Sequence, residues 1–492
     1  MNYNELKSGT DIRGVASDLG GKAVNLTDEA VCDITAAFIL WVAKKTGKNP
    51  SELKIAIGHD SRISAERIKA AAESVLLLAG VKVYDCSLSS TPAMFMTTVE
   101  LGVDASIQIT ASHHPFDRNG LKFFTRDGGL DSSDIADIVA EANEGRRAPV
   151  ADGKIEKIDF MTVYAGILRK TICDALGVDE ASKPLKSKKI IVDAGNGAGG
   201  FYAEKVLKEL GADIEGSQFL NPDGMFPNHI PNPENKEAME SICSAVKRSG
   251  ADLGIIFDTD VDRAGCVDST GNEINRNRLI ALASIIALNG NEGGTIVTDS
   301  VTSDGLKKFI NEDLGGVHYR YKRGYKNVIN KAIELNEQGI NCPLAIETSG
   351  HAALRENYFL DDGAYLATKI VIELARGNDI DKMLENLLMP AEEREIRLNI
   401  KAADFKSYGN EVIAKLEAFA KDNGDCVIAD DNREGMRITT PFGWMLLRLS
   451  VHDPVMPVNF ESDEVGGVDK TVEFFRGFYE QFTGLDLSAY NG

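Results

Sequence analysis

Short apolar runs alternate with longer stretches of mixed polarity along most of the chain. The runs at 54–57 and 253–257 are rich in Ile and are flanked by Gly and Asp. Such runs are typical of buried strands, and the stretches between them have the length and polarity of helices. The alternation predicts an α/β protein.

Three segments share one order: strand, acid, helix, a Gly-containing turn after Leu, strand, helix, and a third strand that ends in a polar loop. The predicted strands are 54–57, 78–83 and 105–109, then 189–193, 210–214 and 253–257, then 295–299, 314–319 and 343–346. Any α/β chain offers some coincidences of this kind, but the shared order favours three similar doubly wound domains. The three final loops carry Ser112, Asp258 and Glu347, at the strand ends where such sheets hold their functional groups.

The last hundred residues follow another pattern. We expect a strand at 393–400, a helix at 408–420, two or three antiparallel strands between 426 and 460, and a helix at 468–482. This order predicts an α+β domain. The predicted domains are therefore 1–152, 153–288, 289–392 and 393–492, which agrees with three or four domains at about 150 residues each.

The charge narrows the set of partners. Lys and Arg number 54 against 75 Asp and Glu, a net charge of −21. This balance argues against nucleic-acid and anionic-membrane binding, although a local basic cluster could still hold an anionic substrate. The seven cysteines are scattered without a Cys-x-x-Cys pair, which is typical of a reducing cytoplasm and argues against zinc and redox motifs. The first residues lack a signal-peptide pattern, and no apolar stretch approaches the length of a membrane span, so we expect a cytoplasmic protein.

The sequence Thr-Ala-Ser-His-His-Pro at 110–115 follows a predicted strand. We expect Ser112 to be exposed, where neighbouring donors could activate it or hold a phosphate on it. A polar turn stopped by Pro115 is the alternative, and a hydrolase would need the Gly-x-Ser-x-Gly elbow that is absent. The adjacent His113 and His114 could suggest a metal, but in an extended loop they would point in opposite directions.

Asp258, Asp260 and Asp262 carry the strongest chemical signal. Three carboxylates at alternate positions repel one another unless a cation lies among them, and hard oxygen ligands favour magnesium or calcium. An EF-hand is excluded by Arg263 and Ser269 at its sixth and twelfth positions, and a dehalogenase-type phosphatase by Asp262 at its fifth. A solvated acidic turn is disfavoured because the apolar run 253–257 leads straight into the acids.

A second class of function is open at 195–200. The sequence Gly-Asn-Gly-Ala-Gly-Gly, with Asp213 further on, matches a dinucleotide fingerprint and would indicate a nicotinamide-dependent oxidoreductase. The equivalent positions of the other two segments, at 60–62 and 299–301, lack the motif, which makes this alternative weak.

Two further groups could bind a sugar phosphate. The sequence Glu-Thr-Ser-Gly-His at 347–351 offers partners for hydroxyls, or else it caps a helix. Arg437 and the stretch 448–454 offer anion donors, and arginine binds phosphate through two parallel hydrogen bonds. Taken alone, these arginines could equally form surface ion pairs.

Together these motifs resemble the α-D-phosphohexomutase family, which includes phosphoglucomutase, phosphomannomutase and phosphoglucosamine mutase. Four motifs stand in the family order: Thr-Ala-Ser-His-x-Pro, Asp-x-Asp-x-Asp-Arg, Glu-x-Ser-Gly-His and the C-terminal Arg-x-Ser. The sequences at 11–14 and 60–64 match as well, so the resemblance spans nearly the whole chain. It implies three α/β domains and a smaller α+β domain around a central cleft.

The resemblance also implies roles for single residues. Ser112 would carry a phosphoryl group, and an oxygen of it would join Asp258, Asp260 and Asp262 around Mg²⁺. Arg13, Lys122 and Arg263 would stabilise charge or move protons. The sugar would be held by the following residues: Arg323, Gly324, Tyr325, Lys326, Glu347 and Ser349, with His351 nearby. Arg437, Arg448, Ser450 and His452 would bind the phosphate that does not react.

The implied reaction interconverts hexose 1-phosphate and hexose 6-phosphate of glucose or mannose, through a sugar bisphosphate of the glucose 1,6-bisphosphate type, in a monomer or homodimer. Phosphoglucosamine mutase is the alternative within the family. Departures from the family pattern are His114, which stands where Asn is commoner, His452-Asp453 in the phosphate loop, and Arg323 and Tyr325 in the sugar loop.

Overall fold

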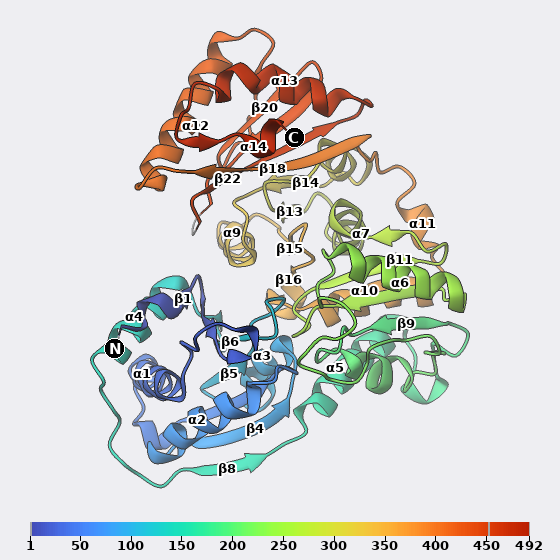
Figure 1. Ribbon diagram of the computed structural model, residues 1–492. Helices are drawn as coiled ribbons and strands as arrows, with labels where there is room; N and C mark the ends of the chain where they lie inside the picture. Colours follow the sequence, from blue (N-terminus) through green and yellow to red (C-terminus); the bar gives the residue numbers. More distant parts are fainter. Residues whose placement is uncertain (1, 451–452, 492) are drawn as a thin grey trace. The chain divides into compact units, whose positions relative to one another are not determined.

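The computed structural model describes residues 2–450 and 453–491. The chain forms two compact units (Figure 1). The first consists of Met1–Ile286 with Ser349–Met383, and the second of Ala287–Thr348 with Leu384–Gly492. The domain boundaries near 152, 288 and 392 stay predictions, since the units group segments that are distant along the chain.

The first unit begins with a large mixed sheet in the order β1-β2-β6-β5-β3-β4-β8. Its strands are β1 (Lys7–Ser8), β2 (Asp11–Val15), β3 (Lys54–His59), β4 (Lys82–Leu88), β5 (Ala105–Ile109), β6 (Arg118–Thr125) and β8 (Lys154–Lys157), with β7 (Gly128–Gly129) paired to β6. The helices are α1 (Asp28–Thr46), α2 (Ala65–Leu78), α3 (Thr91–Glu100) and α4 (Ser132–Asn143). The apolar positions of α1, α2 and α4 share one core with the sheet, and the Ser112 loop follows the carboxyl end of β5.

The second sheet of this unit has the order β12-β11-β10-β9. Its strands are β9 (Ile190–Asp193), β10 (Leu253–Phe257), β11 (Ala264–Asp268) and β12 (Glu273–Ile274), with α5 (Phe160–Leu176), α6 (Lys236–Ser249) and α7 (Arg276–Leu288). The strand predicted at 210–214 is wrong. Gly211 has φ +92°, and only isolated bridges form at Asp213 and Gln218. The hairpin of β16 (Ala352–Leu354) and β17 (Leu360–Asp361) also belongs to this unit, together with α10 (Gly363–Ala375) and α11 (Ile380–Met383).

The second unit contains a parallel set in the order β14-β13-β15 and a six-stranded antiparallel sheet in the order β19-β20-β21-β22-β18-β23. The first set comprises β13 (Thr295–Thr298), β14 (Val317–Arg320) and β15 (Leu344–Ile346), with α8 (Asp304–Lys308) and α9 (Tyr325–Glu337). The antiparallel sheet comprises β18 (Glu392–Ile400), β19 (Val427–Ile428), β20 (Met436–Thr440), β21 (Gly443–Leu447), β22 (Val455–Ser462) and β23 (Leu485–Asp486), with α12 (Phe405–Asp422), α13 (Gly467–Tyr479) and α14 (Ser488–Asn491). The predicted α/β class with a C-terminal α+β domain is confirmed. Among the described residues, no helix is long and apolar enough to cross a bilayer.

Candidate active site

Ser112 lies in the loop that follows β5, and the structure buries it. Ser112 is only 3% exposed, so the expectation of an exposed serine is wrong. The backbone at Ser112 has φ +50°, a conformation that costs free energy for a residue with a Cβ. Its amide donates to Thr110 Oγ1 over 2.9 Å, and Thr110 in turn donates to Asp60 over 2.7 Å. These bonds hold a strained turn that the bare chain would not adopt.

Arg62 holds the same loop in place through hydrogen bonds to its backbone. The buried guanidinium donates to the carbonyl oxygens of Ser112, His114, Pro115 and Arg118, and Asp60 lies 3.2 Å from its Nε as counter-ion. Burial lowers the pKa of Arg62, while the Asp60 carboxylate opposes that shift. The sequence showed Asp60 and Arg62 only as a motif, and their role as the support of the Ser112 loop comes from the structure.

The two adjacent histidines do not point apart. The rings of His113 and His114 stack with centroids 5.1 Å apart, because the turn at Ser112 is not extended. Burial, with help from Arg263, lowers the pKa of His113 to about 2. Burial and Arg13 lower the pKa of His114 to about 3. Both rings are therefore neutral, and His113 Nδ1 lies 3.3 Å from Ser112 Oγ.

Asp258, Asp260 and Asp262 follow β10 and are buried to within 1% exposure. One oxygen from each lies within 4.8 Å of the others, and the intervening Val261 has φ +67°, which is rare for a β-branched residue. Ser112 Oγ donates to Asp258 Oδ2 over 3.1 Å. The Oδ1 atoms of Asp260 and Asp262 are buried without a hydrogen-bond partner among the described residues. Unsatisfied buried carboxylate oxygens are costly, and they suit a hard divalent cation.

Two cations partly balance the three acids. Lys122 Nζ on β6 lies 2.5 Å from Asp262 Oδ2 and 3.3 Å from Asp260 Oδ2. Arg263 Nε lies 3.2 Å from Asp258 Oδ2, and its Nη2 donates to Ser112 Oγ over 2.8 Å. Burial, together with the charges of Asp262 and Asp260, raises the pKa of Asp258. Burial also acts to raise the pKa of Asp262, but Lys122, His351 and Arg263 outweigh it and lower that pKa.

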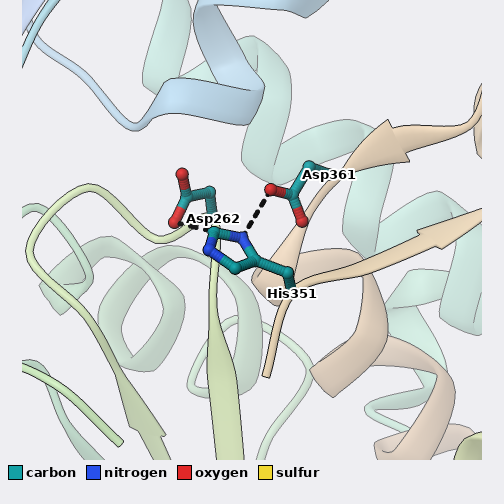
Figure 2. A group of neighbouring side chains, drawn as sticks. All are labelled: Asp262, His351 and Asp361. Atoms are coloured by element: carbon teal, nitrogen blue, oxygen red, sulfur yellow. Dashed lines mark hydrogen bonds and ion pairs between the residues drawn. The ribbon is translucent and has the colours of Figure 1, made fainter. Parts of the chain in front are cut away.

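His351 completes this cluster (Figure 2). Its Nδ1 lies 2.6 Å from Asp361 Oδ2 and 3.8 Å from Asp262 Oδ1. Burial would lower the pKa of His351, but Asp361 and Asp262 outweigh burial and raise it. The prediction placed His351 near the sugar loop, whereas the structure brings it to the metal loop. Sequence reasoning missed Asp361, which pairs with His351, and Thr91, whose amide and hydroxyl both bind Asp260.

Arg13 lies on β2, next to β6. Its Nη2 pairs with Asp11 over 2.7 Å, and its charge acts on both His113 and His114. Arg13 is therefore at the edge of the Ser112 loop, as the resemblance implied. Ser349 is buried in the first unit, whereas Glu347 is buried in the second.

The remaining sugar-loop residues lie in the second unit. Glu347 Oε1, at the end of β15, accepts a hydrogen bond from the Gly324 amide over 2.5 Å. Arg323 Nε lies 3.9 Å from Asp299 Oδ2, and its amide donates to Glu434 over 3.2 Å. Tyr325 and Lys326 begin α9, whose amino terminus carries positive partial charge. The structure therefore brings Gly324 and Glu347 into contact beside Arg323, and the sugar-binding role that the resemblance implied for them stays a prediction.

Arg448 and Ser450 lie on the loop between β21 and β22, as expected. Arg448 Nη2 donates to Asn459 over 3.2 Å, and its buried Nε has no hydrogen-bond partner among the described residues. A buried guanidinium N–H without an acceptor suits an anion. Ser450 Oγ accepts from the Asp453 amide over 3.2 Å. His452 lies outside the described residues.

Arg437, predicted beside them, is engaged elsewhere. On β20 it donates to the carbonyl oxygens of Ser300 and Thr302 and to Asp304 over 2.9 Å. Its guanidinium carbon lies 3.5 Å from the centroid of the Trp444 ring. Burial, with the charge of Arg320, lowers its pKa to about 10. These contacts favour a structural role that joins two parts of the second unit.

The glycine motif at 195–200 has a packing explanation. A Cβ on Gly197 would lie 2.5 Å from the carbonyl oxygen of Thr259 in the metal loop, and one on Gly200 would overlap the carbonyl of Leu220. The glycines thus permit close backbone approach. The dinucleotide interpretation is not favoured.

Comparisons with known proteins agree with this geometry. Family models for the phosphoglucomutase/phosphomannomutase α/β/α domains I, II and III match this chain at residues 6–148, 170–271 and 275–390, respectively. A phosphomannomutase/phosphoglucomutase of Pseudomonas putida is 29% identical over 95% of this chain and 93% of its own length. A phosphoglucomutase of Neisseria gonorrhoeae is 29% identical over 96% of this chain and 95% of its own. A crystal structure of a phosphoglucomutase/phosphomannomutase family protein from Burkholderia thailandensis superposes with a TM-score of 0.79, 27% identity and 98% coverage of both chains.

Proposed function

Because the chain belongs to the phosphoglucomutase/phosphomannomutase family, we propose that it interconverts the 1- and 6-phosphates of glucose and mannose through a phosphoserine at Ser112. The observation that carries this proposal is the position of Ser112 Oγ, 3.1 Å from Asp258 and 2.8 Å from Arg263. A serine in this position can carry a phosphoryl group whose negative charge is balanced by Arg263 on one side and by a cation held by the acids on the other.

Asp258, Asp260 and Asp262 would hold Mg²⁺ together with a phosphoserine oxygen. Two of these carboxylates have buried oxygens without a hydrogen-bond partner among the described residues, which fits a six-coordinate ion with oxygen ligands. When bound, the ion withdraws charge from the transferring phosphoryl group.

The side chains around Ser112 have distinct tasks. Transfer breaks the bond between phosphorus and Ser112 Oγ and forms one between phosphorus and a sugar hydroxyl oxygen. Arg263 donates to Oγ and stabilises the negative charge that develops there as the bond breaks. Lys122 and Arg13 supply further positive charge, and on balance the proton of the attacking hydroxyl ends on Ser112 Oγ, which leaves as the free serine hydroxyl. His113 and His114 are neutral and buried, so they do not add charge to the phosphate.

The sugar bisphosphate that results would turn end over end and return its other phosphoryl group to Ser112. Each of its two phosphate groups must therefore fit both the reacting position at Ser112 and the position of the phosphate that does not react. Glu347, Arg323 and Gly324, with Tyr325, Lys326 and Ser349, would contact the sugar. Arg448 and Ser450 would bind the phosphate that does not react. The Nε of Arg448, which has no hydrogen-bond partner among the described residues, supports that assignment. A sugar bisphosphate would also phosphorylate Ser112 and act as activator.

A coupled assay tests the proposal. The protein is offered glucose, mannose, glucosamine and N-acetylglucosamine 1-phosphates with Mg²⁺ and a trace of the corresponding bisphosphate. The expected result is turnover of the glucose and mannose phosphates that Ser112→Ala abolishes. Preference for glucosamine phosphate would instead support a phosphoglucosamine mutase. Full activity of Ser112→Ala would contradict the phosphoserine mechanism.

A further inference from the structure

The glycine loop Gly195–Gly200 and the segment 219–235 contribute no reacting group to the chemistry described above, although Asn232 of this segment accepts a hydrogen bond from Arg263 over 3.3 Å. The segment 219–235, here called the strap, precedes α6 and contains little regular structure. Both segments belong to the first unit, and both contact loops that carry reacting groups. Their contacts connect the metal loop with the Ser112 loop, which come from different sheets.

Asn196 anchors the strap to the glycine loop. Its amide donates to the carbonyl of Phe219 and its carbonyl accepts from the amide of Asp223, both over 2.9 Å. Its side-chain Nδ2 donates to the carbonyl of Asn221 over 2.9 Å, and its Oδ1 accepts from Asn228 over 2.7 Å. Each polar group of Asn196 is therefore bonded to the strap.

The same glycine loop rests on the metal loop. The amide of Ala198 donates to the carbonyl of Thr259 over 2.8 Å, and Gly197 lies so close to Thr259 that no side chain would fit. Thr259 stands between Asp258 and Asp260. The strap is thus fixed to the segment that places two of the three carboxylates.

The part of the strap between Asp223 and Asn228 covers the segment that supports the Ser112 loop. A Cβ on Gly224 would collide with the backbone of Ser61, Arg62 and Ile63, so the strap lies directly on this segment. The ring centroid of Phe226 lies 5.3 Å from the guanidinium carbon of Arg62. A cation over an aromatic face is attracted to it, and more strongly when it is buried, as Arg62 is. Phe226 holds this place with φ +50°, an unfavourable backbone for an aromatic residue.

We infer that the strap sets the distance between the Ser112 loop and the metal loop, and that Phe226 is a positioning residue that acts through Arg62. Arg62 binds three carbonyl oxygens of the Ser112 loop and the carbonyl oxygen of Arg118 at the start of β6, so a shift of its guanidinium would shift Ser112 Oγ. The path runs from Thr259 through Asn196 and the strap to Phe226, Arg62 and Ser112. The kinetic consequence rests on the proposed mutase function, whereas the structural consequence does not.

Substitution of Phe226 tests this inference. Phe226→Leu keeps an apolar side chain and removes the aromatic face, whereas Phe226→Tyr keeps the face. Met225→Leu is the matched control, since Met225 is the neighbouring strap residue and is 45% exposed. Two quantities are measured in each variant: amide hydrogen exchange across residues 110–118, and kcat and KM for the sugar monophosphate.

For Phe226→Leu we expect faster exchange at 110–118 than in the rest of the first unit, and a fall in kcat of about 5- to 30-fold with little change in KM. Phe226→Tyr should restore both quantities, and Met225→Leu should match the wild type. Should Phe226→Leu fail to fold, Phe226→Met takes its place. Unchanged exchange at 110–118, or an increase spread evenly over the unit, would overturn the inference. Lack of mutase activity in the wild type would contradict the proposed function alone, because the exchange measurement tests the strap without it.

Discussion

Ser112 Oγ donates a hydrogen bond to Asp258 Oδ2 over 3.1 Å, although the two residues are 146 positions apart and follow strands of different sheets. The bond joins the hydroxyl that would carry the phosphoryl group to the loop that would hold the metal. Because Arg263 binds both partners, one guanidinium fixes the geometry of the pair.

Removal of the divalent cation should stop turnover, and Asp260→Asn should imitate it. The amide keeps the volume of the carboxylate and can still accept from Thr91, but it removes a charge from the metal site. We expect kcat to fall on the order of 100-fold or more. The melting temperature in chelator should not fall, because the substitution also relieves repulsion among three buried acids. Steady-state kinetics and thermal unfolding check both parts.

The control for that comparison is Asp174→Asn, which removes an exposed carboxylate. Among the described residues, the Asp174 side chain forms an ion pair only with Lys170. Asp174→Asn should leave kcat unchanged. Undiminished turnover by Asp260→Asn, or by the wild type after complete chelation, would refute a catalytic metal at this loop.

Arg448→Ala should raise KM for the sugar monophosphate. The lost charged hydrogen bonds correspond to a fall in kcat/KM of roughly 10- to 150-fold. Phosphorylation of Ser112 by a sugar bisphosphate should persist, since the reacting residues are untouched. Arg437→Lys is the informative comparison, because Arg437 binds Ser300, Thr302 and Asp304. Arg437→Lys should lower the melting temperature and should affect KM less than Arg448→Ala does. The reverse pattern would show that Arg437, and not Arg448, binds the phosphate.

Glu461 should make the stability of the second unit depend on pH. Burial, opposed by the bond from Trp444 Nε1, raises its pKa to about 7. Between its unfolded value of about 4.3 and its folded value, the folded state holds a proton that the unfolded chain has released. Glu461 therefore costs stability as pH rises through that range, and the cost is constant above it.

Glu461→Gln removes this titration. The variant should match the wild type near pH 4 and exceed it by roughly 3 kcal/mol above pH 7, or less where the carboxylate relaxes. Thermal unfolding at a series of pH values gives the difference directly. A variant that is less stable at pH 8 than the wild type would contradict the pKa assigned to Glu461.

The sequence predicts strands well where an apolar run is buried on both faces. The predicted bounds at 105–109 and 253–257 coincide with β5 and β10, whose residues are all buried. The repeat pattern failed at 210–214, where Gly211 at φ +92° and the turn closed by Ser217 leave only isolated bridges. An analogy between repeats cannot show where the chain turns before it pairs.

The sequence predicts those parts of the candidate site whose residues lie in one loop. It does not predict contacts between side chains that are distant along the chain. Asp258, Asp260 and Asp262 cluster as their spacing indicated. The burial of Ser112 was not predictable, because Arg263 and the strap-covered Arg62 come from distant segments. The pairing of Asp361 with His351 was not predictable from the sequence, because it depends on the β16–β17 hairpin that brings the two side chains together.

The most direct test of the phosphoserine mechanism is the mass of the protein after incubation with glucose 1,6-bisphosphate and Mg²⁺. The wild type should gain one phosphoryl group, and peptide mapping should locate it on Ser112. Subsequent addition of excess glucose 1-phosphate should move this group to the sugar as glucose 1,6-bisphosphate, and glucose 6-phosphate should form as the other phosphoryl group returns to Ser112. Ser112→Ala should gain none. Phosphorylation at another residue, or full mutase turnover without a phosphorylated Ser112, would contradict the mechanism.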